Sequence, residues 1–485
     1  MTFKLSRNFY LSIKSLIYIL YGLFTIKAFL NFNSLDLKIA ILICGFLIEL
    51  TVITFLNHWY KLKQPLLLDW FRLATFISIV LNFISITETL DNNLSFELND
   101  FVSVSSDQGL PTILAVLIGL LALRLGEMLV NLSKKSKVTL KNSVQKHIRS
   151  LQFNRKFIFL IFTALLILAQ LFLMFKGIVG YGTEGNHTIA SYSFMIQSIS
   201  IMGPFVLAMF AIIKYKYKDK GRFFNLTFLI YFIMQIVIGF LSGMKENIIS
   251  PILIVIIPFI LSGNKISMRI FISGFIFFIL LYPINNNYRY YTNAYTNLNK
   301  MTYLQMAILE TFEGDFIENF IGGTQSYQNR LSLFPLFMYS VENEKQWTEY
   351  KNLNRYIYLP ISWIIPRFLL TSKPTSNTGS KLYLMTAGRE SSSVTPSTYG
   401  WAYLEGGYIP LFFIFSLFGA FITYLQINLN KEHLFGLLLF ITVLVALLKV
   451  ESDIYFKISE ILQTILIGFI LYKIFFKVKK KKVRF

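Results

Sequence analysis

Long apolar stretches recur along this chain, and they restrict its fold more than any other feature. We place them at residues 11–30, 38–56, 65–86, 110–131, 157–177, 191–213, 223–241, 246–262, 267–283, 408–427, 433–450 and 458–476. A helix needs roughly 17 to 25 such residues to cross a bilayer, and in hydrocarbon only internally hydrogen-bonded backbone survives. The pattern predicts an all-α integral membrane protein with about 12 transmembrane helices.

The composition agrees with that class and excludes others. Of the 485 residues, 55% are hydrophobic and only 15% are charged, a balance foreign to soluble globular chains. The single cysteine, Cys44, lies in an apolar stretch, so we expect neither disulfides nor a thiolate metal site. The net charge of +21 lies mostly in short connections and the tail, where Lys and Arg meet anionic headgroups. We therefore expect no nucleic-acid partner.

One long polar interval, residues 284–407, breaks the apolar pattern. It is rich in tyrosine and nearly balanced in charge, and such long loops are usually functional or disordered. Its aromatic content favours a folded loop. We therefore divide the chain into residues 1–283 with nine spans, 284–407 as a large, partly helical, extracytoplasmic catalytic loop, and 408–485 with three spans and a basic cytoplasmic tail.

Periodicity within the loop predicts its local structure. Leu309, Phe312 and Phe320 recur at helical spacing, and Gly322 and Gly323 are expected to end that helix. A second helix is expected from near Ser326. Residues 363–370 are apolar but too short to span, and suit an interfacial or re-entrant segment.

The distribution of Lys and Arg predicts the orientation, because short basic connections stay in the cytoplasm. Residues 131–156 contain eight Lys and Arg and no acid, and residues 214–222 and 477–484 repeat this bias. The connection between the third and fourth spans carries five acids and no Lys or Arg. Both termini are therefore expected in the cytoplasm, and the long loop outside.

Five ionisable residues lie within or near the ends of predicted spans: Glu49, Asp69, Arg72, Arg124 and Glu127. Each costs roughly 2.5 to 3.5 kcal/mol at the bilayer centre if it is unpaired. They could form an ion or proton path, or a structural cluster of ion pairs. Most lie toward the cytoplasmic ends of their spans, which favours the structural cluster.

The loop's own residues limit the chemistry that it can perform. The sequence has no phosphate-binding Gly-Lys-Ser/Thr motif and no His-Glu-x-x-His motif, so we expect no cofactor and no metal. The loop is rich in arginine, whose planar fork suits bidentate phosphate binding. Each arginine could instead form a salt bridge or a headgroup contact at the outer surface. We favour a functional role for Arg289 and Arg367, and Arg389 fits the two explanations about equally. For Arg330 and Arg355, a salt bridge at the outer surface explains the residue at least as well.

Three segments resemble the Wzy-type O-antigen polymerases, which join oligosaccharide repeat units. They are residues 242–247 (SGMKEN), 365–374 (IPRFLLTSKP) and 393–409 (SVTPSTYGWAYLEGGYI). The many-span topology with one large late outer loop extends the resemblance over the whole chain. The sequence departs from the family where Gly400 is followed by Trp401 instead of an acid, and where Lys245 replaces a frequent arginine.

The resemblance implies a metal-independent glycosyltransferase that joins polyprenyl-diphosphate-linked oligosaccharides on the outer face of the bacterial inner membrane. Arginines would stabilise the diphosphate leaving group, and an acid would deprotonate the acceptor hydroxyl. Glu405 is preferred as the acid over Glu246 and Asp453. The expected catalytic residues are Arg289, Arg367, Arg389 and Glu405, and the expected substrate-binding residues are Arg330, Lys245, Lys373, Tyr399 and Tyr403.

The partners implied are the lipid-linked oligosaccharide, the bilayer, and chain-length regulator and flippase proteins. An O-antigen-type ligase uses the same donor and is poorly separated by sequence. A flippase or other transporter would predict repeated halves and short outer loops, and neither is visible. A structural subunit of an export complex is a further alternative.

The predicted orientation can be tested with cysteines introduced singly in a Cys44→Ser background. We expect positions 323 and 380 to react with an impermeant thiol reagent added to intact cells, and position 141 to react only after permeabilisation. Labelling at position 141 in intact cells, with none at 323 or 380, would contradict the orientation.

Overall fold

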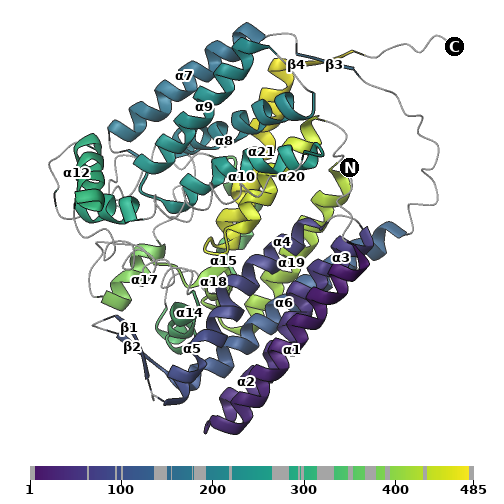
Figure 1. The fold of residues 1–485 in the computed structure, drawn as a ribbon, viewed down its shortest axis with the longest axis vertical. Helices are drawn as coiled ribbons and strands as arrows, with labels where there is room; N and C mark the ends of the chain where they lie inside the picture. Colours follow the sequence, from purple (N-terminus) through teal and green to yellow (C-terminus); the bar gives the residue numbers. More distant parts are fainter. Residues whose placement is uncertain are drawn as a thin grey trace.

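The computed structural model describes residues 6–62, 65–92, 95–99, 102–135, 150–153, 156–176, 178–179, 193–217, 221–264, 283–292, 295, 300–313, 333–347, 353–365, 378–387, 394–429 and 434–479. Helices dominate these residues (Figure 1). They are α1 (Arg7–Asn31), α2 (Leu35–Ile48), α3 (Thr54–Leu62), α4 (Leu67–Thr75), α5 (Leu81–Asn92), α6 (Gly109–Lys135), α7 (Lys156–Phe175), α8 (Ser193–Tyr215), α9 (Arg222–Leu241), α10 (Lys245–Leu261), α12 (Lys300–Glu313), α14 (Phe334–Glu342), α15 (Asn354–Ile357), α16 (Leu359–Ser362), α17 (Thr378–Ala387), α18 (Ser397–Tyr403), α19 (Tyr408–Asn428), α20 (Leu434–Leu448) and α21 (Ile454–Phe475).

The apolar helices confirm an all-α membrane protein. In the described part of the chain, nine helical stretches are long and apolar enough to cross a membrane, and two shorter apolar helices occupy Glu246–Leu261 and Leu434–Leu448. Short π-helical turns join α2 to α3 and α4 to α5, so each pair counts as one stretch. These helices correspond to every predicted span except 267–283, which lies outside the described residues.

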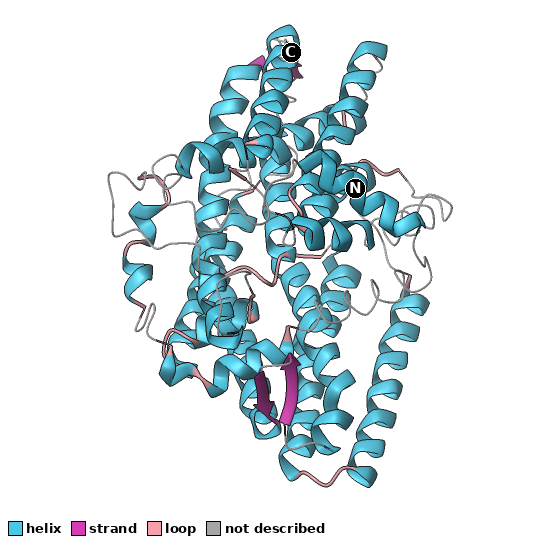
Figure 2. Ribbon diagram, turned by 90° about the vertical axis from the view of Figure 1, so that its left-hand side faces the viewer, coloured by secondary structure: helices cyan, strands magenta, loops and turns pink. Residues whose placement is uncertain are grey.

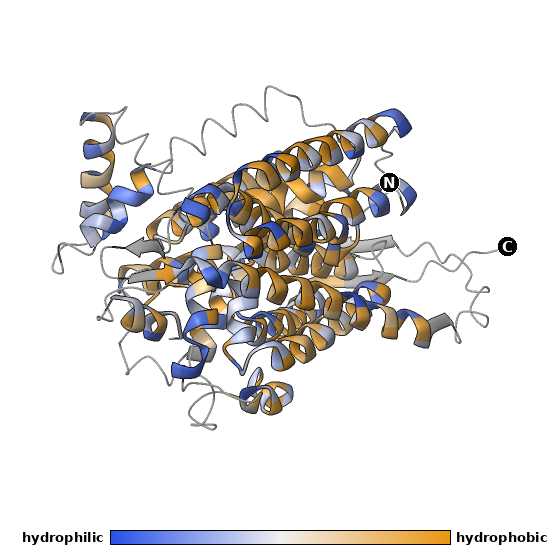
Figure 3. Cartoon of the chain, turned by 90° about the horizontal axis from the view of Figure 1, so that it is seen from below, coloured by the Kyte–Doolittle hydropathy of each residue, from blue (hydrophilic) through white to orange (hydrophobic). Residues whose placement is uncertain are grey.

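Large apolar side chains cover the outside of the bundle. Leu23 and Leu30 on α1 are 60% and 78% exposed, and Phe157 and Leu168 on α7 are 75% and 62% exposed. Such surfaces would be a liability in water, whereas lipid tails are as apolar as these side chains. Figure 3 shows the apolar helices lying side by side between two more polar ends of the molecule.

The helices form two groups. In the first, which we call the α6 bundle, α6 packs against α2 and α19, and α1 packs on α2. In the second, the α21 bundle, α8 contacts α7, α9, α10, α20 and α21. The groups meet where α4 packs on α20 and where α18 contacts α6, α19 and α21.

Two short antiparallel ribbons mark opposite ends of the molecule (Figure 2). Strands β1 (Ser95–Asn99) and β2 (Val102–Ser105) lie at the end that also holds α12 and α14–α18, which we call the loop end. Strands β3 (Ser150–Phe153) and β4 (Phe476–Lys479) lie at the other end, the tail end, and join the start of α7 to the end of α21.

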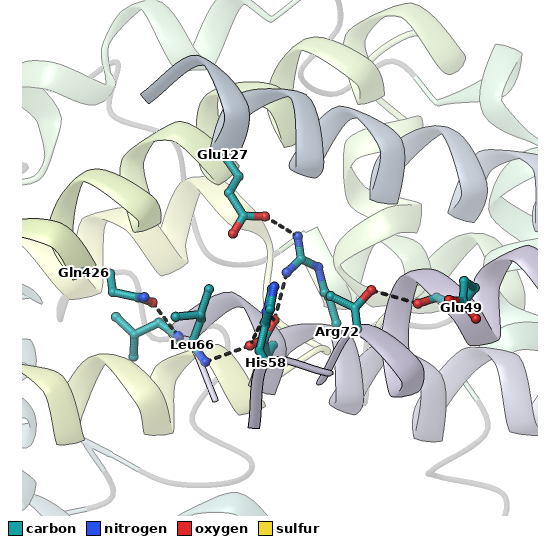
Figure 4. Close-up of polar contacts among 9 residues, drawn as sticks. Glu49, His58, Leu66, Arg72, Glu127 and Gln426 are labelled. Carbon is teal, nitrogen blue, oxygen red and sulfur yellow. Dashed lines mark hydrogen bonds and ion pairs between the residues drawn. The ribbon is translucent and has the colours of Figure 1, made fainter. Parts of the chain in front are cut away.

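A buried cluster of ion pairs at the tail end joins α3, α4 and α6 (Figure 4). The Arg72 guanidinium donates to Asp69 at 2.9 Å and to Glu127 at 2.6 Å, and His58 Nδ1 lies 2.9 Å from Asp69 Oδ2. Arg72 is 3% exposed and Asp69 is fully buried. The predicted structural cluster is confirmed for these three charged residues.

The other two ionisable residues of that prediction lie elsewhere. Glu49 accepts a hydrogen bond of 2.6 Å from the Tyr18 hydroxyl of α1. Arg124 is exposed on α6. Neither belongs to the Arg72 cluster, because helical rotation places them on other faces of their helices.

The helix predicted around Leu309–Phe320 is present in part. It begins at Lys300 as α12 and is described as far as Glu313, and the remainder lies outside the described residues, as does the region around Ser326. Leu309 and Phe312 are 52% and 56% exposed, whereas Tyr303 and Ala307 are buried against Tyr288 and Phe240. The face that packs is therefore not the one that the apolar spacing suggested.

Glycines allow α6 and α19 to approach at backbone distance. A Cβ at Gly126 would lie 2.0 Å from the carbonyl oxygen of Ser416, and one at Gly419 would lie 2.3 Å from that of Leu123. Membrane helices without a hydrophobic driving force depend on such close packing of small residues. The α6–α19 contact therefore has no room for a side chain at either position.

We expect Gly126→Val to separate the two helices and to lower the melting temperature of the purified protein clearly, because overpacking alone costs about 1–3 kcal/mol and here the obstacle is backbone. Gly22→Val on α1 is the matched control, since a Cβ there meets nothing within 4 Å. Equal melting temperatures for the two variants would contradict the packing described.

Candidate active site at the α20–α21 turn

The turn between α20 and α21 is anchored to α18. The Thr398 backbone N–H donates to the Val450 carbonyl at 2.7 Å, and its hydroxyl contacts the carbonyls of Val450 and Ser452 at 2.7 and 2.8 Å. The Asp453 carboxylate caps α21 by accepting from the Tyr455 N–H at 2.9 Å. The main chain of residues 449–453 is thus fixed at the loop end.

A buried triad of charges closes one side of this turn. Arg355 donates through Nε to Glu405 and through Nη1 to Asp453. The three residues are 4%, 0% and 4% exposed. The Tyr356 hydroxyl lies 3.4 Å from the second oxygen of Asp453. A single guanidinium therefore joins three segments that are distant in sequence: α15, the α18–α19 connection and the start of α21.

Burial leaves Glu405 poised to exchange a proton near neutral pH. Its removal from water raises the pKa of the carboxyl to about 7, against the opposing effect of the Arg355 charge. Oε1 is bound to Arg355, whereas the buried Oε2 has no hydrogen bond among the described residues. Glu405 therefore has an oxygen free to accept a proton, at a pKa suited to general-base chemistry.

A buried lysine links the triad to the other side of the turn. Lys457 is 1% exposed, and its ammonium donates to the Lys449 carbonyl at 2.6 Å and lies 3.4 Å from the Thr398 hydroxyl. It also sits 5.1 Å from the centre of the Phe71 ring. Lys457 therefore connects α21 to the end of α20 and to α18.

A second group of charges lies beside a cavity on the far side of the turn. Lys449 Nζ is 3.6 Å from Glu246 at the start of α10 and 3.8 Å from Glu460 on α21. Lys449 and Glu460 line a cavity of about 210 Å³ between α8, α10, α20 and α21. A neighbouring cavity of about 100 Å³ shares Ser200, Pro204, Asn247 and Ser250 with it.

Helix α20 is short for a membrane span. Its 15 residues extend about 22 Å at 1.5 Å per residue, less than the hydrocarbon thickness of about 30 Å. Charged residues within an apolar bundle need partners or a polar cavity, and both are present around the turn that follows α20.

The segment after Arg355 follows α21 into the bundle. The Ser362 and Tyr455 hydroxyls are 2.5 Å apart, and Gln463 Nε2 donates to the Trp363 carbonyl at 2.8 Å. Gln463 lies nine residues into α21, about 13 Å along it. Residues 353–365 therefore contact α21 on one face, where Ser362 is buried, whereas Ile357 and Ile361 are 72% and 55% exposed. The interfacial or re-entrant segment predicted at 363–370 is described only as far as Ile365 and stays a prediction.

The structure brings together all three acids that were considered as bases, because Glu405, Asp453 and Glu246 surround the same turn. Arg289 lies on a half-buried part of the helix 283–292, at the loop end, since the neighbouring Tyr288 hydroxyl donates to the Leu241 carbonyl at 3.0 Å. Lys245 is the first residue of α10. Arg330, Arg367, Lys373 and Arg389 lie outside the described residues.

The two predicted sugar-binding tyrosines occupy the core. Tyr399 is fully buried between the rings of Phe71 and Phe415, and its hydroxyl is 3.4 Å from that of Thr75. Tyr403 is 8% exposed and meets the Tyr408 ring edge to face. Neither lines the two cavities described above. Their positions favour a packing role, and substrate binding by these tyrosines stays a prediction.

Arg355 requires a correction. The sequence analysis rated a salt bridge at the outer surface at least as highly as a functional role for this residue. The structure shows a salt bridge with the loop acid Glu405, but it is buried and Asp453 is a second partner, so the surface location was wrong. Its partners lie 50 and 98 residues further along the chain, so no local pattern reveals the contact.

Three functional candidates were missed by sequence reasoning: Lys449, Lys457 and Glu460. A signal for them does exist. Charged residues cluster between and just inside the last two apolar stretches, 433–450 and 458–476, where an ordinary hairpin connection needs none. In the described residues no group of three or more His, Cys, Asp and Glu side chains could hold a metal ion.

Comparison with known families covers most of the chain. The model of a domain family of unknown function, DUF8712, matches residues 137–482. This chain belongs to the DUF8712 family. The matched region contains α7–α21, and therefore both the Arg355 triad and the cavity, whereas the Arg72 cluster lies before it. None of the curated proteins and none of the solved structures matches the chain.

The raised pKa of Glu405 predicts a pH-dependent stability. The folded state binds more protons than the unfolded state between pH 4.5 and about 7, so stability falls as the pH rises through this window, by on the order of 3 kcal/mol, and then levels off. We expect Glu405→Gln to abolish this fall, because the amide cannot ionise.

Thermal unfolding of the purified protein from pH 4.5 to 8 measures this effect. Glu313→Gln is the matched control, since Glu313 is exposed on α12. Parallel stability curves for the wild type and Glu405→Gln would show that Glu405 does not titrate in this window.

Proposed function

We propose that this protein is an oligosaccharide repeat-unit polymerase of the bacterial inner membrane. It would transfer a growing glycan from polyprenyl diphosphate to the next lipid-linked repeat unit, on the extracytoplasmic face. The proposal extends to twelve spans with both termini in the cytoplasm, so that the loop end faces outward. The span proposed at 267–283 lies outside the described residues except for its last residue.

One arrangement carries the proposal: the α20–α21 turn has a buried proton acceptor on one side and a polar cavity on the other. Glu405 supplies a carboxyl with a pKa of about 7 and one free oxygen. The cavity is lined by charged, amide and hydroxyl side chains inside an otherwise apolar bundle. Polar cavities within membrane helices mark sites of function, and this one lies beside the bilayer that holds a lipid-linked substrate.

The reaction requires one proton acceptor and one stabilised leaving group. The acceptor hydroxyl oxygen attacks the anomeric carbon of the donor glycan and forms the new glycosidic bond. Its proton passes to Glu405. The bond from the anomeric carbon to the diphosphate breaks, and polyprenyl diphosphate leaves with the electron pair. Arg289, with Arg367 and Arg389, would stabilise the charge that develops on the diphosphate. The donor bond supplies the driving force.

The product that remains without this protein distinguishes it from its alternatives. We expect a deletion strain to accumulate glycans one repeat unit long and to lose long chains, because export and transfer of single units continue. Loss of a ligase would leave long chains on the carrier, and loss of a flippase would leave single units on the cytoplasmic leaflet. Mass analysis of lipid-linked glycans separates the three, and long carrier-linked chains in the deletion strain would refute the polymerase.

Complementation of that strain tests the proposed residues. We expect Glu405→Gln to slow chain growth by roughly 10²–10⁴-fold, the usual contribution of a positioned base. Arg289→Ala should also abolish long chains, and Arg289→Lys should restore little, because lysine lacks the bidentate fork. Arg222→Ala, at an exposed position at the start of α9, is the control. Wild-type chains from Arg289→Ala at normal protein abundance would remove this residue from the site.

A further inference from the structure

The cavity beside the turn is formed by proline-containing helices. Pro204 lies inside α8 and Pro251 inside α10. A proline has no N–H to donate to the carbonyl four residues earlier, so Ser200 and Asn247 lose their usual helical donors. Both residues line the two adjoining cavities. Interruptions of helical hydrogen bonding in membrane helices are tolerated where the backbone lines a cavity.

The lining side chains present donors and acceptors together. Gln197 and Asn247 contribute amides, and Ser250, Thr442 and Thr464 contribute hydroxyls. Amides and hydroxyls donate and accept, which is what a ligand with several hydroxyl groups needs. The Thr442 hydroxyl donates to the Leu438 carbonyl at 3.1 Å, and Asn247 Nδ2 donates to the Ser242 hydroxyl at 3.1 Å. Both side chains keep acceptor oxygens, which a diphosphate, itself only an acceptor, could not use.

The charges in the cavity wall cancel. Lys449 is the cation of the lining and Glu460 is its anion, 3.8 Å apart, and Glu246 adds a second carboxylate at 3.6 Å from the lysine. A diphosphate placed here would face two carboxylates for one ammonium. The balance favours a neutral ligand over an anionic one.

We infer that this cavity, between α8, α10, α20 and α21, is a carbohydrate subsite that holds one sugar residue of the substrate. The lining matches sugar hydroxyls in chemistry. One water occupies about 30 Å³, so the volume of about 210 Å³ corresponds to about seven waters and suits a single ring. The assignment of that ring to the lipid-linked repeat unit rests on the proposed function. The diphosphate would then lie outside this cavity, toward the loop arginines.

Binding of a glycan without its diphosphate tests the inference. The probe is the repeat-unit oligosaccharide released from its lipid by mild acid, titrated by calorimetry into the purified full-length protein. We expect wild-type protein to bind it, and Ser250→Leu, which fills the cavity, to bind at least tenfold more weakly. Thr464→Val keeps the side-chain volume, removes one hydroxyl, and should weaken binding severalfold. Ser15→Leu on the exposed face of α1 is the matched control and should bind like wild type.

Inorganic diphosphate added as a competitor should leave this binding unchanged. Displacement of the oligosaccharide by diphosphate, wild-type affinity in both cavity variants, or no binding by the wild type would each overturn the carbohydrate subsite. The two proposals can fail independently. If the deletion strain loses long chains but the wild-type protein binds no oligosaccharide, only the carbohydrate subsite is refuted. If binding depends on the cavity but the deletion strain keeps long chains, only the polymerase is refuted.

Discussion

The ion pairs of Arg355 with Glu405 and Asp453 determine how the loop is joined to the membrane bundle. Each of the three side chains would be costly to bury alone, and removing one partner from a buried pair costs about 3–5 kcal/mol. The guanidinium therefore holds α15, the α18–α19 connection and the start of α21 in one arrangement. The Thr398 contacts fix the same turn from α18. Together these contacts position an acid, a lysine and a cavity beside one another at the loop end.

The apolar bundle makes this polar centre possible. Close backbone contact between α6 and α19, through Gly126 and Gly419, gives the first group of helices a fixed frame. The turn follows the short helix α20, and the cavity beside it lies against the proline-containing helices α8 and α10. The Arg72 cluster joins α4 to α6, and its charges are paired with one another.

The sequence predicted those features that depend on local pattern. Apolar stretches identified the described helices of the bundle, and ionisable residues at span ends identified the Asp69–Arg72–Glu127 cluster. Glu405, Asp453 and Glu246 entered as candidate acids through the family resemblance, and the structure places all three around one turn. The burial of Arg355 was not predictable, because it depends on partners 50 and 98 residues away. Tyr399 illustrates the same limit: it lies in a motif, yet the contact of α18 with α6 and α19 places its ring in the core.

We propose that this chain itself catalyses repeat-unit polymerisation with Glu405 as its base. Incubation of the purified protein in lipid with polyprenyl-diphosphate-linked repeat units, without nucleotide sugar or added metal, tests it most directly. If the protein is a polymerase, we expect a ladder of glycans that lengthens by one repeat unit at a time, with release of polyprenyl diphosphate. We expect almost no ladder from Glu405→Gln. Folded wild-type protein that leaves the repeat units unextended, or a Glu405→Gln variant that extends them at the wild-type rate, would contradict it.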